Sequence, residues 1–326
     1  GMESPVVSLL VPIFNVESYI EKCLHSLFAQ SFKSIEYVFV NDCTPDRSIE
    51  KLWTVLNQYP DRKPFVKVIN HNTNQGLSAA RKTALLHATG SYVWHIDSDD
   101  YIALDAVEKL YEKASSLDAD MVVFDVMELY SDNKNKIVEN AVPLDKKEYL
   151  KLLLIRQRRY ELCFRFCKKE LYKGLELDTE IGFGEDYATT PRLACIANKV
   201  VKLDSICYYY IKYNQSSYTK SISIKAVQSI ERAMLLLESF FQNRDCCEYN
   251  EILQISKMYL KVHMLKGTVY NAESFLYANN LFPELHNASL SQIKFKDNIL
   301  LLINRYKWYG ILKIYIKLGL ALVNKK

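Results

Sequence analysis

SYVWHIDSDD, residues 91–100, runs from an apolar, strand-like segment directly into three aspartates within four positions. Carboxylates this close repel one another, and each raises the pKa of its neighbours unless a cation or hydrogen-bond donors compensate. A hard divalent cation such as Mg²⁺ or Mn²⁺ prefers oxygen ligands and often joins one or two carboxylates to substrate phosphates. We therefore interpret Asp97, Asp99 and Asp100 as part of a metal and phosphate site.

The segments around this stretch alternate between strand-like and helix-like patterns. Short apolar runs rich in Val and Ile predict buried strands over residues 6–12, 35–41, 65–70, 91–96 and 120–126. Apolar residues at helical spacing predict helices over 17–30, 77–88 and 104–117, and Thr44 before Pro45 predicts the start of another. This order of elements predicts an α/β fold of three layers with a mainly parallel central sheet.

Acidic residues follow two of the predicted strands. In sheets of this kind ligands bind at the carboxyl ends of the strands, so Asp42 should lie on the same edge as Asp97 and Asp99. Helix capping is the alternative, with Asp42 or Asp46 capping one following helix and Asp99 or Asp100 another. One cap accounts for one acid, and it leaves the rest of the set unexplained.

The turn after the first strand excludes two common ways of binding a nucleotide. Its sequence, PIFNVES over residues 12–18, contains no glycine, whereas a dinucleotide site uses a glycine-rich turn there. A Walker-type loop is also absent, because the sequence contains neither GKS nor GKT. A nucleotide diphosphate bound to this sheet would need a cation held by the acids.

Four segments carry a resemblance to a known family. VSLLVPIFNVESYIEKCLHSLFAQSF, EYVFVNDCTPDRS, NQGLSAARKTALLHATG and SYVWHIDSDD occur in this order, and together they resemble the family 2 glycosyltransferases from Val7 to about Val126. The resemblance implies the GT-A fold and inverting transfer of a sugar from a nucleotide diphosphate donor, with a UDP-sugar favoured, to an acceptor hydroxyl.

The resemblance also implies roles for single residues. Pro12 and Asp42 match positions that border the nucleoside, Asp42 being expected to bind the base, and Arg81 matches an arginine that helps to hold the nucleotide. Asp97 and Asp99 match the DxD pair, with Asp97 near the ribose and the metal and Asp99 as the main ligand of Mn²⁺ or Mg²⁺. Phe14 stands where tyrosine is frequent, which leaves the base preference open.

The general base is expected outside this nucleotide-binding half. IGFGEDY, residues 181–187, places Glu185 and Asp186 after a Gly-Phe-Gly stretch and before a helix-like segment. In the resembling family, the Asp of such a pair takes the proton from the acceptor hydroxyl, so we expect Asp186 to be the catalytic base. An acidic first helical turn, favoured by the helix dipole, is the simpler interpretation, and the two can coexist.

The chain after residue 200 gives fewer signals. Consecutive tyrosines, Tyr208 to Tyr210, suit a buried aromatic edge strand, and Asn214, Ser216 or Ser217 could approach the diphosphate or the acceptor. From about Ser223 the pattern becomes helical. We therefore expect a GT-A catalytic domain over residues 1–220 and an α-helical region over 221–326.

Residues 300–326 form an unusual tail, with a broad apolar and aromatic face beside a narrow polar stripe. The longest apolar run is far shorter than the roughly 20 residues of a spanning helix. The tail could lie on a membrane surface with its lysines toward anionic lipid, or it could dock against the helical region. Eight Lys or Arg against one Asp in residues 294–326 leave the preceding chain slightly acidic, which argues against nucleic acid binding.

The cysteine pattern and the amino-terminal sequence suggest a location. The eight cysteines lack a disulfide-like spacing, and the first residues lack a secretory signal, so we expect a cytoplasmic protein, peripheral on the membrane if the tail binds lipid. Cys163 and Cys167 are interpreted as core residues because no second ligand pair follows at zinc-site spacing. The alternative to an active transferase is a catalytically weak protein that binds nucleotide sugars or docks on membranes.

Overall fold

The computed structural model describes residues 3–213, 221–244 and 247–325. The chain divides into two compact units: residues 1–153 with 158–216, and residues 154–157 with 217–326. Each unit is described by itself. Asn214, Ser216 and Ser217 lie outside the described residues, so their predicted approach to the diphosphate stays a prediction.

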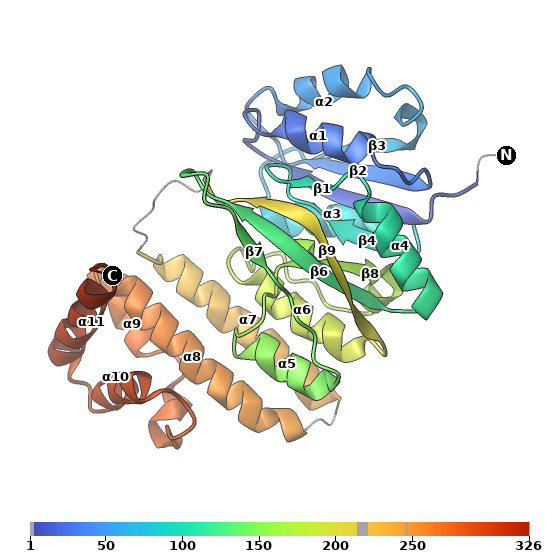
Figure 1. The fold of residues 1–326 in the computed structure, drawn as a ribbon. Coiled ribbons are helices and arrows are strands. Elements are labelled where there is room, and N and C mark those ends of the chain that lie inside the picture. Colours follow the sequence, from blue (N-terminus) through green and yellow to red (C-terminus); the bar gives the residue numbers. More distant parts are fainter. Residues whose placement is uncertain (1–2, 214–220, 245–246, 326) are drawn as a thin grey trace. The chain divides into compact units, whose positions relative to one another are not determined.

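The first unit is built on one mixed sheet (Figure 1). Its strands follow the order β3-β2-β1-β4-β8-β6-β9-β5, and β7 pairs with β6. The bounds are β1 Val7–Ile13, β2 Ile35–Asn41, β3 Val66–Asn70, β4 Tyr92–His95, β5 Tyr101–Ile102, β6 Met121–Leu129, β7 Lys136–Val138, β8 Arg165–Lys168 and β9 Val200–Ile211. Strands β1 to β4 are mutually parallel, as is the pair β6 and β9, so the predicted parallel framework is confirmed.

Helices cover both faces of this sheet. Their bounds are α1 Ile20–Phe28, α2 Ser48–Leu56, α3 Leu77–Leu86, α4 Ala106–Leu117, α5 Lys146–Leu154 and α6 Glu185–Ile196. Side chains of α1, α2 and α4 pack into one core with the faces of β1 and β2 that carry Leu9 and Phe39. Ala80 and Ala84 of α3 pack against Leu10 on the opposite face. Successive residues of each strand point to opposite faces of the sheet, so helices cover both faces. This is the predicted three-layer arrangement.

Two local predictions were wrong. The helix expected at Pro45 begins at Ser48, because the Asp46 carboxylate accepts bonds from the backbone N–H of Ser48 at 3.1 Å and from the Thr44 hydroxyl at 2.7 Å. These bonds hold residues 44–47 in a turn instead of a first helical turn. The tyrosine-rich strand β9 is not an edge strand, since it lies between β6 and β5.

The second unit is helical, as expected. It contains α7 Ile224–Asn243, α8 Asn250–Thr268, α9 Ala272–Asn279, α10 Phe295–Arg305 and α11 Tyr309–Val323. Short 3-10 helices occupy Lys63–Phe65, Leu162–Phe164 and Lys169–Tyr172 in the first unit, and Cys247–Tyr249 and Pro283–Asn287 in the second. Among the described helices, none combines the length and the apolar character that crossing a bilayer requires.

Candidate active site

The three aspartates after β4 have different environments. Asp97 and Asp99 are partly exposed, whereas Asp100 is buried. Asp100 accepts hydrogen bonds from the Tyr208 hydroxyl at 2.5 Å and from the backbone N–H of Ile211 at 2.9 Å. Burial, followed by the charges of Asp99 and Asp97, holds the pKa of Asp100 well above its usual range. Asp100 therefore anchors the turn to β9, and only the other two acids face solvent.

Tyr208 connects this anchor to the site. Its hydroxyl oxygen also accepts a bond from the backbone N–H of Asp97 at 3.1 Å, so one buried hydroxyl holds both ends of the turn. The sequence alone assigns Tyr208 no catalytic role, because three consecutive tyrosines in a strand are typical of packing. Only the pairing of β9 beside β5 brings this side chain under the aspartates.

Arg81 of α3 gathers acidic side chains from distant segments. Its Nη2 lies 2.9 Å from Asp97 Oδ1, and its Nη1 lies 3.0 Å from Glu185 Oε2 and 2.6 Å from Asp186 Oδ1. The Arg81 side chain is 4% exposed. Burial alone would lower the pKa of Arg81, but the charges of Asp186, Asp97 and Glu185 outweigh burial and hold it well above its usual value. One cation therefore faces three carboxyl groups.

Asp186 lies in the first turn of α6. Gly184 precedes the helix with φ of 89°, a left-handed conformation that suits glycine. The second carboxylate oxygen of Asp186 accepts a bond from the backbone N–H of Leu162 at 3.1 Å. The neighbouring Glu185 has a raised pKa, first because it is buried and further because of the Asp186 charge, although Arg81 opposes both. The structure thus brings the predicted base beside Asp97.

Asp42 is fully engaged in holding a loop. Its buried carboxylate accepts bonds from His71 Nδ1 at 2.8 Å, from the backbone N–H groups of Gln75 at 2.8 Å and Gly76 at 2.9 Å, and from Asn74 Nδ2 at 3.1 Å. This loop leads directly into α3, so Asp42 fixes the helix that carries Arg81. The expected bond from Asp42 to a base stays a prediction, and Pro12 is buried in β1 beside Val40 of β2.

His95, the last residue of β4, belongs to the supporting layer. Burial and, to a smaller degree, the charge of Arg81 lower its pKa to about 3, so the imidazole is neutral at pH 7. Its Nε2 lies 3.2 Å from the Tyr172 hydroxyl. Within the described part of the chain, its buried Nδ1 has no hydrogen-bond partner.

The arrangement fits a cation that takes some of its ligands from protein carboxylates and the others from a bound phosphate compound. In the described residues, His, Cys, Asp and Glu side chains form no group of three or more that could hold a metal by themselves. Mg²⁺ in phosphate-transfer sites commonly takes one or two carboxylates and completes its shell with water and substrate phosphates. Asp97 and Asp99 offer partly exposed carboxylate oxygens of this kind, next to an excess of acidic groups.

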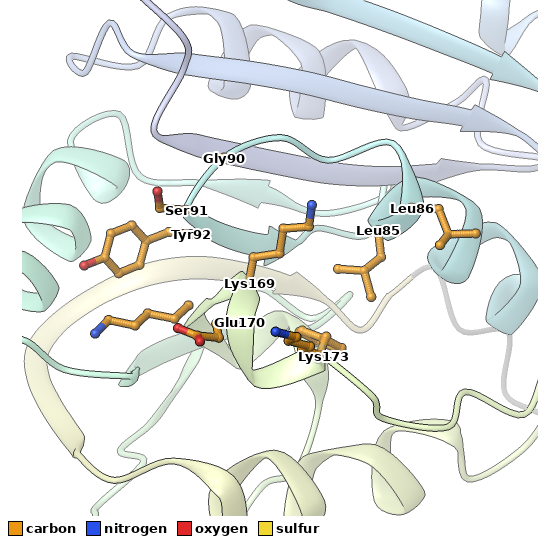
Figure 2. Close-up of a pocket in the computed structure, with 10 residues that line it drawn as sticks. Leu85, Leu86, Gly90, Ser91, Tyr92, Lys169, Glu170 and Lys173 are labelled. Atoms are coloured by element: carbon orange, nitrogen blue, oxygen red, sulfur yellow. The ribbon is translucent and has the colours of Figure 1, made fainter.

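A separate hollow of about 680 Å³ lies at the opposite, amino end of β4 (Figure 2). Leu85, Leu86 and Tyr92 contribute apolar surface to it, together with three lysines. Lys169 donates to the Ala88 carbonyl oxygen at 2.5 Å, and Lys168 binds Asp118. Two of the three lysines are bound to groups of the protein itself, which leaves fewer positive charges to bind an anionic ligand in this hollow. The acids after β4 are therefore the better candidate for the active site.

Comparisons with known proteins show which family this chain resembles. Residues 8–173 match the model of glycosyl transferase family 2. An uncharacterized glycosyltransferase, EpsJ of Bacillus subtilis, is 34% identical over 66% of this chain and 63% of its own length. Glycosyltransferase GlyA of Streptococcus pneumoniae is 30% identical over 77% of this chain and 37% of its own length. The matches therefore span less than two thirds of these relatives.

The fold also matches a solved structure. The crystal structure of S. aureus TarS 1-349 in complex with UDP superposes with a TM-score of 0.70 at 21% identity, over 95% of this chain and 90% of that one. At this identity the likeness establishes the fold, which is GT-A with a helical carboxyl-terminal region. The family match covers just over half of the chain, from β1 to the segment after β8, so this protein belongs to glycosyl transferase family 2.

Proposed function

We propose that this protein is an inverting glycosyltransferase. It moves a sugar from a nucleotide diphosphate donor, preferably a UDP-sugar, to the hydroxyl of a saccharide or lipid-linked acceptor during synthesis of a surface polysaccharide or glycolipid. The observation that carries the proposal is the cluster in which Arg81 holds Asp97 and Asp186 within 2.9 Å, beside the carboxyl end of β4. The UDP bound to the TarS structure supports a uridine donor.

Asp99 and Asp97 are the residues that would hold Mn²⁺ or Mg²⁺. When bound, the cation supplies electrostatic stabilisation of the negative charge that develops on the leaving diphosphate. Arg81 keeps the Asp97 carboxylate in place, and Tyr208 fixes the turn that carries both acids. The excess of carboxylates around Arg81 explains why the site would take up a divalent cation together with an anionic donor.

Asp186 acts as the general base in this proposal. Arg81 and the N–H of Leu162 bind its two oxygens, which fixes the carboxylate, and its side chain is 21% exposed and thus open to an acceptor. The acceptor hydroxyl loses its proton to Asp186 while its oxygen attacks the anomeric carbon from the side opposite the diphosphate. Such a base typically contributes roughly 10²- to 10⁴-fold to the rate.

The test compares three variants in a screen of nucleotide sugars. Thermal shift with and without Mn²⁺ first identifies the donor, because a ligand that binds the folded state raises the melting temperature. With that donor, Asp99→Ala should abolish the Mn²⁺-dependent release of the nucleotide. Asp186→Asn should keep the thermal shift and lose roughly 10²- to 10⁴-fold in transfer. Asp61→Asn, at an exposed position away from the cluster, is the matched control.

The rival function is a catalytically weak protein that binds nucleotide sugars. Donor binding without Mn²⁺-dependent hydrolysis or transfer in the wild-type protein would favour this rival. Hydrolysis that persists unchanged in Asp99→Ala would contradict the proposed use of the acids.

We also propose that the tail, residues 300–326, binds the surface of the cytoplasmic membrane leaflet. Ile311, Ile314, Leu318 and Leu322 of α11 are 55 to 67% exposed and recur at helical spacing, whereas Leu312 on the other face is buried. One face of α11 thus packs within the helical unit, and the other face leaves apolar side chains exposed. The lysines of this segment suit anionic headgroups.

Vesicle flotation tests this surface. Ile314→Glu with Leu318→Glu should abolish flotation with vesicles that contain anionic lipid, while Leu276→Glu, an exposed leucine of α9, should not. Deletion from Asn304 onward is a poorer test, because buried Asn304 donates to the Asn279 side chain at 2.7 Å. Equal flotation of the double variant and the wild type would refute membrane contact through α11.

A further inference from the structure

The loop that leads into the proposed base exposes an aromatic side chain. Phe183 stands three positions before Asp186 in the sequence and is 43% exposed. A hydrophobic residue directly before a helix cap often packs against the fourth helical residue. In α6 that residue is Ala188, which is buried and offers only a methyl group. Packing against α6 therefore does not account for the exposed part of the Phe183 ring.

Hydrogen bonds hold the loop on both sides of Phe183. On the amino-terminal side, the carbonyl oxygen of buried Ile181 accepts a bond from the Ser78 hydroxyl of α3. On the other side, the carbonyl oxygen of Gly184 accepts a bond from the backbone N–H of Ala188 at 2.9 Å, in the first turn of α6. The ring thus projects from a backbone that is fixed before a ligand arrives, which lowers the entropic cost of binding.

The bond from Ser78 also joins the loop to the helix that carries Arg81. Leu77, the neighbour of Ser78, is exposed, so both of the joined segments present an apolar side chain to solvent. Three residues of chain span at most about 11 Å, which limits the separation of Phe183 and Asp186 along the loop. A saccharide whose hydroxyl meets the Asp186 carboxylate can therefore also reach the Phe183 ring.

An exposed aromatic ring selects among sugar acceptors by shape. The face of the ring carries partial negative charge and attracts weakly positive groups. A pyranose such as glucose presents C–H groups together on one face, so it can stack flat on the ring. An acyclic alditol phosphate has no such face, because its backbone bends freely and carries hydroxyls and phosphates along its length.

We propose that Phe183 determines acceptor specificity by stacking against the sugar that Asp186 activates, and that this acceptor sugar is a pyranose. The inference rests on the proposed glycosyltransferase function and adds the class of acceptor. Phe183 acts on acceptor binding, while Asp99 and Asp97 act on the donor and its cation. Removing the ring should therefore weaken the acceptor and leave the nucleotide unaffected.

The experiment measures binding of defined probes to the whole chain, in the presence of UDP and Mn²⁺, by saturation-transfer NMR titration. The probes are methyl β-glucopyranoside, methyl N-acetyl-β-glucosaminide and ribitol 5-phosphate. Phe183→Ala removes the ring and Phe183→Tyr keeps it. Phe295→Ala is the matched control, because Phe295 of α10 is also an exposed phenylalanine. Thermal shift with UDP and with the UDP-sugar is recorded for each protein.

We expect at least one pyranoside to bind the wild type more tightly than ribitol 5-phosphate does. Phe183→Ala should weaken that pyranoside roughly three- to ten-fold, the range that one aromatic stacking contact supplies. Phe183→Tyr and Phe295→Ala should both match the wild type. The thermal shifts should be equal in all four proteins, which separates loss of a stacking contact from damage to the fold or to the donor site.

Three results would overturn the proposal: no pyranoside binds the wild type, ribitol 5-phosphate binds it more tightly than either pyranoside, or Phe183→Ala binds the pyranosides as the wild type does. A smaller thermal shift of Phe183→Ala with the UDP-sugar would also overturn it, because the ring would then contact the donor. Mn²⁺-dependent hydrolysis of the UDP-sugar by the wild type, measured in parallel, reports separately on the proposed function.

Discussion

Replacing Arg81 with methionine tests the acidic cluster most directly. The substitution keeps much of the side-chain volume but removes the only cation that Asp97, Glu185 and Asp186 share in the ion pairs described above. These carboxylates are 17 to 25% exposed, so they would be left mostly buried without their partner. Breaking a buried ion pair from one side costs about 3–5 kcal/mol.

The expected loss is large enough for thermal unfolding to measure. For a unit of 150–250 residues, each 1 kcal/mol corresponds to roughly 2–4 °C, so Arg81→Met should lower the melting temperature by roughly 6–20 °C. Fluorescence of Trp94, which is buried in the same unit, follows the transition. Arg47→Met removes an exposed pair with Glu50 and should change little, because both partners are well solvated.

Added Mn²⁺ sharpens the test. Three carboxyl groups without Arg81 repel one another and should bind a divalent cation more tightly, so millimolar Mn²⁺ should raise the melting temperature of Arg81→Met more than that of the wild type. A melting temperature of Arg81→Met within 2 °C of the Arg47→Met control would refute the reasoning. Equal responses of both proteins to Mn²⁺ would refute the part that concerns the cation.

Three further substitutions probe other parts of the structure. Tyr208→Phe removes the hydroxyl that binds the Asp97 N–H and the buried Asp100 carboxylate. It should lower the free energy of unfolding in urea by about 1–3 kcal/mol, and an unchanged free energy would contradict this. Gly90→Ala places a methyl group 2.8 Å from the backbone nitrogen of Ser8 in β1 and should cost about 1–3 kcal/mol, whereas Gly310→Ala, with open space around it, should cost nothing. Burial lowers the pKa of Lys261 to about 8 from 10.5, so the unfolded chain binds more protons between these values and wild-type stability rises with pH there. The difference in unfolding free energy between the wild type and Lys261→Met should therefore move by roughly 3 kcal/mol in favour of the wild type from pH 7 to pH 10.5, and a constant difference would speak against this cause.

The framework of the fold was predictable because it depends on local patterns. Apolar runs located the parallel strands, and β2 occupies the predicted residues 35–41. Strand β8 carried no such signal, since RFCK contains two basic residues and Arg165 is buried through bonds to the Tyr149 hydroxyl and the Arg159 carbonyl oxygen. Its place in the sheet depends on partners far away in the sequence, which no periodicity reveals.

The site was predictable in its acids but not in their connections. The rule for strand ends located Asp97 and Asp99, and the family resemblance pointed to Arg81 and Asp186. Neither indicated that Arg81 binds both Asp97 and Asp186. About a hundred residues separate Arg81 from Asp186, and only the folded chain brings Arg81 Nη1 within 2.6 Å of the Asp186 carboxylate. Tyr208 was missed because its hydroxyl acts through a buried bond, and a row of tyrosines does not distinguish a packed ring from an anchoring one.

The position of β8 also sets the order in which strands of the sheet can pair while the protein is being synthesised. It hydrogen-bonds to both β4 and β6, although residues 165–168 follow both of those strands in the sequence. Strands β4 and β6 therefore leave the ribosome before β8, and each has one edge unpaired until β8 is synthesised. Unpaired strand edges can pair with the wrong strand or with another chain. Premature contact of β4 with β6 would close the sheet without its middle strand, so a nascent chain that stalls before residue 165 is the form most exposed to misassembly.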